Sequence, residues 1–144
     1  MLAVSGLVPL VMPYPTITIY CDGSCSPNPG RGSYGAVIIS NGKHSALAGV
    51  SEEPRTTSQR MEITAAIRSL EALAVPSSVD IFSDSRYLVR GAQREPKATK
   101  ANYDLWLRLK EVSKPHSVKY HWIKGHSGHP YQERADKLAV HMRG

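Results

Sequence analysis

The sequence predicts an α/β domain with a mixed five-stranded sheet, three antiparallel strands followed by two parallel ones, flanked by helices. Apolar and polar residues alternate in the first part of the chain, as they do in half-buried strands. Apolar residues then recur every three or four positions in a long segment, which is the spacing of a helix. Short apolar segments alternate with helical ones in the remainder, and this order favours parallel strands joined by crossover helices.

Three strands are expected first. Residues 16–21 alternate, with Ile17, Ile19 and Cys21 on one side of a half-buried strand. Residues 23–33 are rich in glycine and proline and are predicted to form a loop. Residues 34–40 and 45–50 form the next two strands, because the Asn-Gly dipeptide between them is a strong hairpin signal.

Helical spacing begins next. Thr56 followed by Gln59 resembles a capping box, and Pro76 marks the end of the first helix. Pro130 is well placed as the first residue of the last helix. Between them the pattern predicts, in order, a strand at 79–84, helices at 85–92 and 102–112, and a strand at 117–125.

A length of 144 residues suits one domain, which we place at residues 16–144. Residues 1–15 are expected to be a disordered or loosely packed leader, because they are too short to span a bilayer and lack the basic start of a signal peptide. Cys21 and Cys25 are expected to be reduced thiols of a cytoplasmic protein, with a local disulfide as the alternative. We expect a monomer that does not associate with membranes.

The net charge of +6 is unevenly distributed. Ten basic residues and only three acidic ones lie between Arg86 and Lys124. A basic segment of this kind suits a polyanion such as nucleic acid, and an ordinary solvated surface is the alternative.

Four acidic residues lie at positions where a ligand-binding or catalytic site could form. Asp22 and Asp84 each follow an apolar strand, and ligand sites in open α/β sheets form beyond the carboxyl ends of strands. Glu62 lies in the first helix, and Asp136 lies beside the apolar stripe of the last one. Taken singly, each has an ordinary explanation as a turn, cap or exposed helical residue.

Taken together, four neighbouring carboxylates would need counter-charge. Hard divalent cations with oxygen ligands supply it, which points to Mg²⁺, with Mn²⁺ as a possible substitute. Two such ions about 3.5–4 Å apart would support in-line displacement at a phosphate.

The same residues carry a resemblance to type 1 ribonuclease H. Five segments resemble its successive motifs, in the family's order and at compatible distances: "YCDGSCSPNPGRGSYGAV", "RTTSQRMEITAAIRSLEAL", "IFSDSRYLVRG", "NYDLW" and "HWIKGHSGHPYQERADKLA". The resemblance extends from Thr16 to Leu138. It implies a ribonuclease H-like fold and a metal-dependent endonuclease that hydrolyses the RNA strand of an RNA/DNA hybrid, leaving 3′-hydroxyl and 5′-phosphate ends.

The resemblance also implies roles for individual residues. Asp22, Glu62, Asp84 and Asp136 match the family's metal-binding acids, and His126 matches its mobile histidine, which aids proton transfer or product release. Residues matching those that contact the RNA strand and the minor groove are Gly23, Ser24, Asn28, Ser58 and Gln59. Residues matching a pocket for a DNA-strand phosphate are Arg55, Thr57 and Asn102.

The chain departs from the family's pattern at two places. Ser58 stands where many members have asparagine, so one groove contact is expected to be weaker. The segment between Gly91 and Asn102 is shorter than the helix and basic protrusion of many bacterial members. Trp106 and Trp122 resemble core positions and are expected to pack inside.

Two other functions remain open on the sequence. One is a hybrid- or nucleic-acid-binding module without catalysis, and the other is a related nuclease of the same fold that acts on DNA. Fold alone does not separate them, but all four acids and His126 are present, which favours the hydrolytic enzyme.

Overall fold

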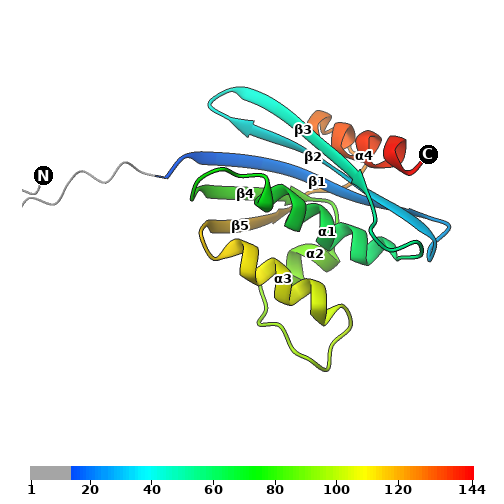
Figure 1. The fold of residues 1–144 in the computed structure, drawn as a ribbon. Helices are drawn as coiled ribbons and strands as arrows, with labels where there is room; N and C mark the ends of the chain where they lie inside the picture. Colours follow the sequence, from blue (N-terminus) through cyan, green and yellow to red (C-terminus); the bar gives the residue numbers. More distant parts are fainter. Residues whose placement is uncertain (1–13) are drawn as a thin grey trace, which may run out of the picture.

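The computed structural model describes residues 14–144, so the predicted leader lies outside the described residues except for Tyr14 and Pro15. The strands and helices follow the predicted order (Figure 1). Their bounds are β1 Thr16–Ser26, β2 Arg31–Ser40, β3 Lys43–Val50, α1 Ser58–Glu71, β4 Ser78–Ser83, α2 Arg86–Gly91, α3 Tyr103–Ser113, β5 Ser117–Trp122 and α4 Pro130–Arg143.

The five strands form one mixed sheet in the order β3-β2-β1-β4-β5. β1, β2 and β3 pair antiparallel, whereas β4 pairs parallel with β1 and β5 parallel with β4. The predicted fold class is therefore confirmed. Helices α1 to α3 cover one face of the sheet and α4 covers the other (Figure 1).

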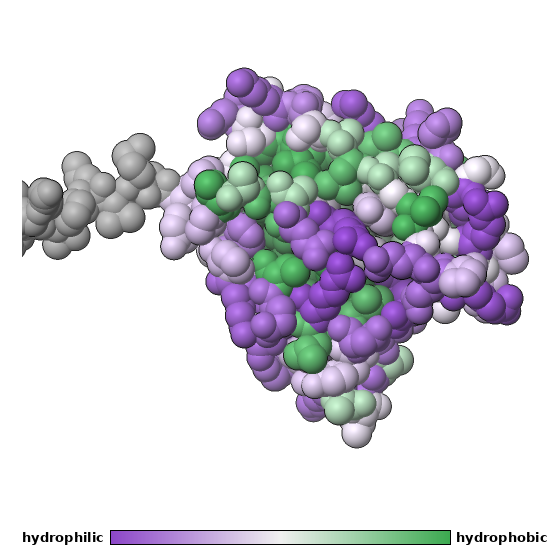
Figure 2. Space-filling model, viewed as in Figure 1, coloured by the Kyte–Doolittle hydropathy of each residue, from purple (hydrophilic) through white to green (hydrophobic). Residues whose placement is uncertain are grey.

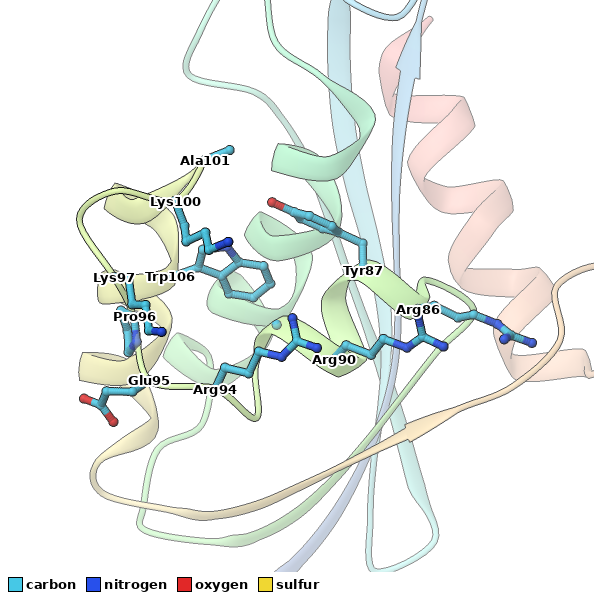
Figure 3. A pocket seen from close by; sticks show the side chains of 11 residues that line it. Arg86, Tyr87, Arg90, Arg94, Glu95, Pro96, Lys97, Lys100, Ala101 and Trp106 are labelled. Carbon is cyan, nitrogen blue, oxygen red and sulfur yellow. The ribbon is translucent and has the colours of Figure 1, made fainter.

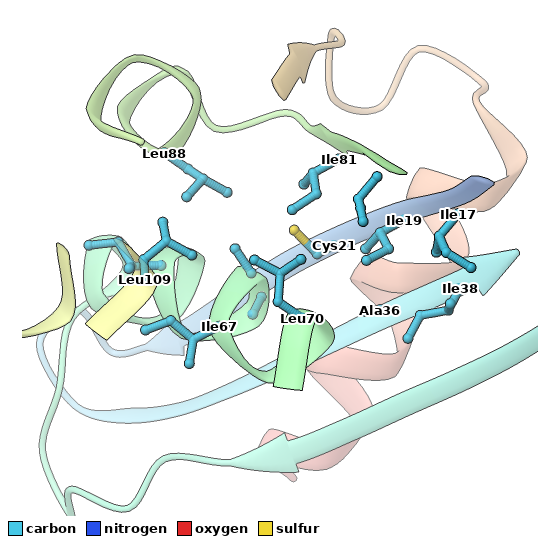
Figure 4. Close-up of a cluster of buried hydrophobic side chains, with 14 of the residues drawn as sticks. Ile17, Ile19, Cys21, Ala36, Ile38, Ile67, Leu70, Ile81, Leu88 and Leu109 are labelled. Atoms are coloured by element: carbon cyan, nitrogen blue, oxygen red, sulfur yellow. The ribbon is translucent and has the colours of Figure 1, made fainter. Parts of the chain in front are cut away.

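The main hydrophobic core lies between the sheet and helices α1 to α3 (Figure 4). Ile17, Ile19 and Cys21 of β1 point into it and pack against Ile67 and Leu70 of α1. Their burial removes about 25 cal/mol of unfavourable hydration for each Å² of apolar surface. Hydrophilic side chains cover most of the face seen in Figure 2, with apolar side chains showing between them.

The opposite side of β1 is also covered, so the prediction of a half-buried strand is wrong there. Tyr20 is 9% exposed and Asp22 is 4% exposed, because α4 packs over β1 and β2. The alternation in the sequence reflects a polar residue placed inside the fold, not a face turned to water.

The predicted loop at residues 23–33 is mostly strand. β1 continues to Ser26 and pairs with β2 from Arg31, with Gly23 opposite Tyr34. Gly23 allows β1 to approach α1 closely, because a Cβ at this residue would lie 2.5 Å from the backbone nitrogen of Glu62. Of the predicted loop, only residues 27–30 form a turn. Two backbone hydrogen bonds join this turn to the residues before α1: Gly30 N–H donates to the Thr56 carbonyl at 2.9 Å, and Thr56 N–H donates to the Gly30 carbonyl at 2.7 Å.

The start of α1 is capped by a side chain one residue later than the sequence predicted. Thr57, not Thr56, caps α1, because its hydroxyl accepts a bond from the backbone N–H of Arg60 at 3.2 Å. The predicted capping box is therefore wrong by one residue. Pro130 is the first residue of α4, as predicted.

Cys21 and Cys25 are both free thiols, and their four-residue separation along a strand is about 13 Å, too far for a disulfide. Among residues 14–144 no helix is long and apolar enough to cross a membrane.

Candidate active site

Two strands that are neighbours in the sheet bring Asp22 and Asp84 together. Tyr20 of β1 is in register with Phe82 of β4, and each aspartate lies two residues further along its parallel strand. β4 ends at Ser83, whereas β1 continues beyond Asp22 paired with β2 alone. The sheet therefore narrows at this point and leaves both carboxylates at the edge where β4 stops.

Glu62 completes a cluster of three carboxylates. It lies in the first turns of α1, next to the segment of β1 that Gly23 brings close. The Gly23 N–H donates to Asp22 Oδ1 at 3.0 Å and to Glu62 Oε2 at 3.2 Å. One oxygen from each of Asp22, Glu62 and Asp84 lies within 4.8 Å of the others, so the three could hold a metal ion.

Asp136 and His126 lie beside this cluster. Asp136 of α4 is close enough to raise the pKa of both Asp22 and Asp84, and His126 acts on Asp84 in the opposite direction, lowering its pKa. His126 adopts a positive φ of 54° in the loop between β5 and α4. The structure thus gathers all five residues that the sequence predicted as catalytic.

The acids strongly perturb one another. The pKa of Asp22 is raised from its ordinary value, first by burial and then by the charges of Glu62 and Asp84. The pKa of Glu62 is also raised, first by burial and then by Asp84. Within residues 14–144 none of the four acids forms an ion pair with a lysine or arginine. The cluster is therefore a concentration of negative charge that a cation would stabilise.

The predicted groove residues lie where the β1–β2 turn meets α1. Asn28 and Ser58 are bonded to each other twice, since Asn28 Nδ2 donates to Ser58 Oγ at 2.7 Å and Ser58 N donates to Asn28 Oδ1 at 3.1 Å. Gln59 is exposed beside them. Ser24 lies on β1, where its hydroxyl accepts a bond of 2.8 Å from Arg143 Nε of α4.

The predicted phosphate pocket is organised by a residue that the sequence reasoning missed. Arg60 donates its backbone N–H to Thr57 and its Nη1 to Asn102 Oδ1 at 3.2 Å. Its guanidinium also pairs with Asp104 at 2.8 Å, which raises its pKa. Arg55, the third predicted member, is exposed. A charged residue inside a helix carries no pattern that would distinguish Arg60 from a surface arginine.

Gln132 was also missed. It is 2% exposed, and its Nε2 donates to the backbone carbonyl of Cys21 at 3.0 Å. The bond joins α4 to β1 next to Asp22 and one turn before Asp136. A polar residue in a helical segment is normally read as exposed, so the sequence gives no signal for this contact.

Trp122 was expected in the core, and that prediction is wrong. The side chain is 40% exposed, because it lies at the end of β5, which is an edge strand of the sheet. Its Nε1 donates to the backbone carbonyl of Asp84 at 3.0 Å, and the guanidinium carbon of Arg86 lies 4.0 Å from the ring centroid. Trp122 therefore holds the backbone of a site residue instead of filling the interior.

Comparison with known proteins identifies this arrangement. A model of the RNase H family matches residues 15–143. The chain belongs to the RNase H family. Ribonuclease H of Cupriavidus necator is 42% identical over 135 residues, which cover 85% of this chain and 92% of that protein. Ribonuclease HI of Caulobacter vibrioides is 42% identical over 137 residues, covering 87% and 91% respectively.

Solved RNase H structures share the fold. LC9-RNase H1, a type 1 RNase H with the type 2 active-site motif, superposes with a TM-score of 0.81 at 26% identity, covering 93% of this chain and 74% of that one. LC11-RNase H1 in complex with an RNA/DNA hybrid gives 0.72 at 24% identity, covering 87% and 94%. Family membership confirms the predicted fold and the predicted activity, an endoribonuclease that cleaves the RNA of RNA/DNA hybrids.

Proposed function

We propose that Asp22, Glu62, Asp84 and Asp136 bind two Mg²⁺ ions, and that this site hydrolyses the RNA strand of a hybrid to 3′-hydroxyl and 5′-phosphate ends. The observation that supports this most is the cluster itself: three carboxylates within 4.8 Å with raised pKa values. Such a cluster is costly without cations.

The donor set fits a hard divalent cation. All four side chains offer carboxylate oxygens, the ligands that Mg²⁺ prefers, and Mn²⁺ accepts the same ligands. The cysteine closest to the acids, Cys21, points into the hydrophobic core and offers no competing soft ligand. Two divalent ions would supply an activated water and charge stabilisation at the phosphorus.

The protein's own groups would orient the substrate. Thr57, Asn102 and Arg55 would grip a phosphate of the DNA strand, and Arg60 holds the first two in place. Gly23, Ser24, Asn28, Ser58 and Gln59 would lie along the minor groove on the RNA side, where the 2′-hydroxyl distinguishes RNA from DNA.

His126 would move a proton close to Asp84. Its imidazole can accept or donate a proton, and it lies in the loop between β5 and α4, outside the sheet. We further propose that the enzyme works as a monomer in the cytoplasm, which equilibrium sedimentation and cell fractionation would check.

The test is a cleavage assay on one end-labelled RNA, presented free, in duplex RNA and annealed to DNA, with and without Mg²⁺. We expect cleavage of the hybrid alone and only with metal. Asp84→Asn should abolish it while leaving the circular dichroism spectrum unchanged, because it removes charge and little volume. Asp80→Asn, on the same strand but paired with His121 outside the cluster, is the matched control and should keep full activity. Near-normal rates in Asp84→Asn would refute the four-carboxylate site.

A further inference from the structure

A pocket of about 920 Å³ lies between α2, the segment joining α2 to α3, and the start of α3, and its lining begins at Arg86, two residues after Asp84. Figure 3 shows its side chains gathered around one hollow, with Tyr87 and Trp106 facing into it from opposite helices. We call it the α2–α3 pocket. Its volume is that of a pocket for a ligand of nucleotide size or larger.

Two aromatic rings form the floor of the α2–α3 pocket. The ring centroids of Tyr87 and Trp106 lie 5.4 Å apart and are tilted by 45°. Gly91 permits this, because a Cβ at that residue would lie 2.3 Å from the Trp106 ring. The Tyr87 hydroxyl accepts a bond of 2.8 Å from Asn102 Nδ2, which fixes the tyrosine beside the proposed phosphate pocket.

Cations surround this floor. Arg86, Arg90 and Arg94 recur every four residues and lie in a row in Figure 3, and Lys97 and Lys100 extend from the connecting segment. Within residues 14–144 none of the five forms an ion pair. Glu95, the one acid of the lining, is paired with Lys110.

We propose that the α2–α3 pocket binds an unpaired, single-stranded extension of the DNA strand, with a base against Trp106 and Tyr87 and its phosphates along the arginine row. The charge complementarity requires a polyanion, and the aromatic floor requires an exposed base face. A base inside a duplex is stacked on its neighbours and cannot reach the floor of a hollow. The pocket therefore fits a single strand.

The position of the pocket identifies which strand. Arg86 lies two residues after Asp84 and stacks on Trp122, so the arginine row begins at the carboxylate site. Asn102, proposed to bind a DNA-strand phosphate, is bonded to the Tyr87 floor. A DNA strand leaving that phosphate pocket therefore continues over the α2–α3 pocket. This assignment of the strand rests on the proposed function.

The test measures binding without catalysis. Titration calorimetry would compare a thymidine hexanucleotide with a hexamer of abasic sites, which has the same phosphates and no bases. We expect the thymidine oligomer to bind at least about fivefold more tightly, the smallest effect typical of one stacked base. Trp106→Phe, which keeps an apolar ring but offers a smaller face, should reduce that preference.

A matched pair of variants separates the pocket from general charge. Arg90→Gln combined with Arg94→Gln should weaken binding of both oligomers, whereas Lys114→Gln combined with Lys119→Gln removes the same charge away from the pocket and should have a smaller effect. Equal affinity for thymidine and abasic oligomers would overturn the proposal, as would a preference unchanged by Trp106→Phe.

Cleavage of hybrids distinguishes this proposal from the proposed function. A six-thymidine extension of the DNA strand, placed at its 5′ end or its 3′ end, should lower KM several-fold relative to a blunt hybrid for one of the two ends. Cleavage of blunt hybrid with no effect of either extension would reject the pocket and keep the active site. Normal binding of thymidine oligomer with no cleavage of any hybrid would reject the active site alone.

Discussion

Asp22 illustrates for a single residue how a proposed catalytic group opposes stability. Its carboxylate is 4% exposed and lies against two other carboxylates, so ionisation inside the fold is unfavourable and its pKa is raised. Removing the charge should therefore stabilise the metal-free protein while removing a proposed metal ligand.

We expect Asp22→Asn to abolish cleavage and to raise the midpoint of thermal unfolding in EDTA at pH 8. One pKa unit corresponds to 1.36 kcal/mol, and a protein of this length gains about 2–4 °C for each kcal/mol. Scanning calorimetry would measure the shift, and Asp80→Asn is the control outside the cluster. A lower midpoint for Asp22→Asn would show that the carboxylate stabilises the fold.

The charge of Asp22 also determines how the difference in stability between Asp22→Asn and the unsubstituted protein should depend on pH. A carboxyl group whose folded-state pKa is raised is protonated in the native state over a range where the unfolded state is ionised, so its contribution to stability is full below about pH 4 and is lost as pH rises. The stability advantage of Asp22→Asn should therefore be near zero at pH 4 and should grow toward pH 8. Saturating Mg²⁺ should reduce it, and urea unfolding across that range would test both expectations.

The acids could be predicted from the sequence, whereas the residues that hold them could not. Asp22 and Asp84 follow apolar strands, and strand order follows from the helical crossover, so their meeting is a consequence of topology. Gln132 and Arg60 act through contacts between elements far apart in the chain, and their own segments look like ordinary amphipathic helices. Long-range polar contacts leave no periodic signal.

Among elements, α4 is held on the sheet partly by a buried polar contact beside the candidate site. Gln132 satisfies the carbonyl of Cys21, and Asp136 lies one turn later on the same helix. The placement of the fourth carboxylate relative to the other three therefore depends on how α4 docks on β1.

We expect Gln132→Ala to lower stability by about 1–3 kcal/mol, because it leaves a buried carbonyl without a partner. Cleavage should also require more Mg²⁺ for half-maximal rate, which a metal titration would measure. Gln93→Ala removes a similar bond, from Nε2 to the Val89 carbonyl, at an exposed residue and is the matched control. An unchanged metal requirement in Gln132→Ala would mean that α4 docks without this bond.

The β1–β2 hairpin shows why element boundaries escape sequence reasoning. Glycine and serine between residues 23 and 33 are typical of loops, but here their small side chains let β1, β2 and the start of α1 approach closely. Composition cannot distinguish a glycine needed for a turn from one needed for contact. At the start of α1, two adjacent threonines offer the same hydroxyl, so composition could not distinguish the predicted cap, Thr56, from the observed one, Thr57.

At the scale of the whole molecule, the positive charge is arranged asymmetrically. The basic lining of the α2–α3 pocket begins at Arg86, two residues after Asp84 of the carboxylate cluster, so negative and positive charge follow each other closely along the chain. The basic segment predicted from the sequence is therefore a defined surface, and its shape could not be predicted because the loop at residues 92–102 has no regular structure.

Replacing Lys97 and Lys100 by glutamine should weaken nucleic-acid binding and reduce its salt dependence. Each phosphate contact contributes roughly −0.9 to the slope of log K against log salt concentration. Affinities measured between 50 and 200 mM salt would give the slope, conditions in which screening changes steeply. Lys43→Gln, on the far strand β3, should leave the slope as it is, and an unchanged slope in the double variant would mean that these lysines do not touch the backbone.

The distribution of the four acids along the chain has a consequence for protein synthesis. They come from β1, α1, the end of β4 and α4, so the last of them, Asp136, leaves the ribosome after all five strands. A nascent chain that ends before α4 has neither the fourth carboxylate nor the helix that covers β1 and β2. If the proposed four-carboxylate site is correct, nuclease activity would begin only after α4 has been synthesised and has packed on β1 and β2.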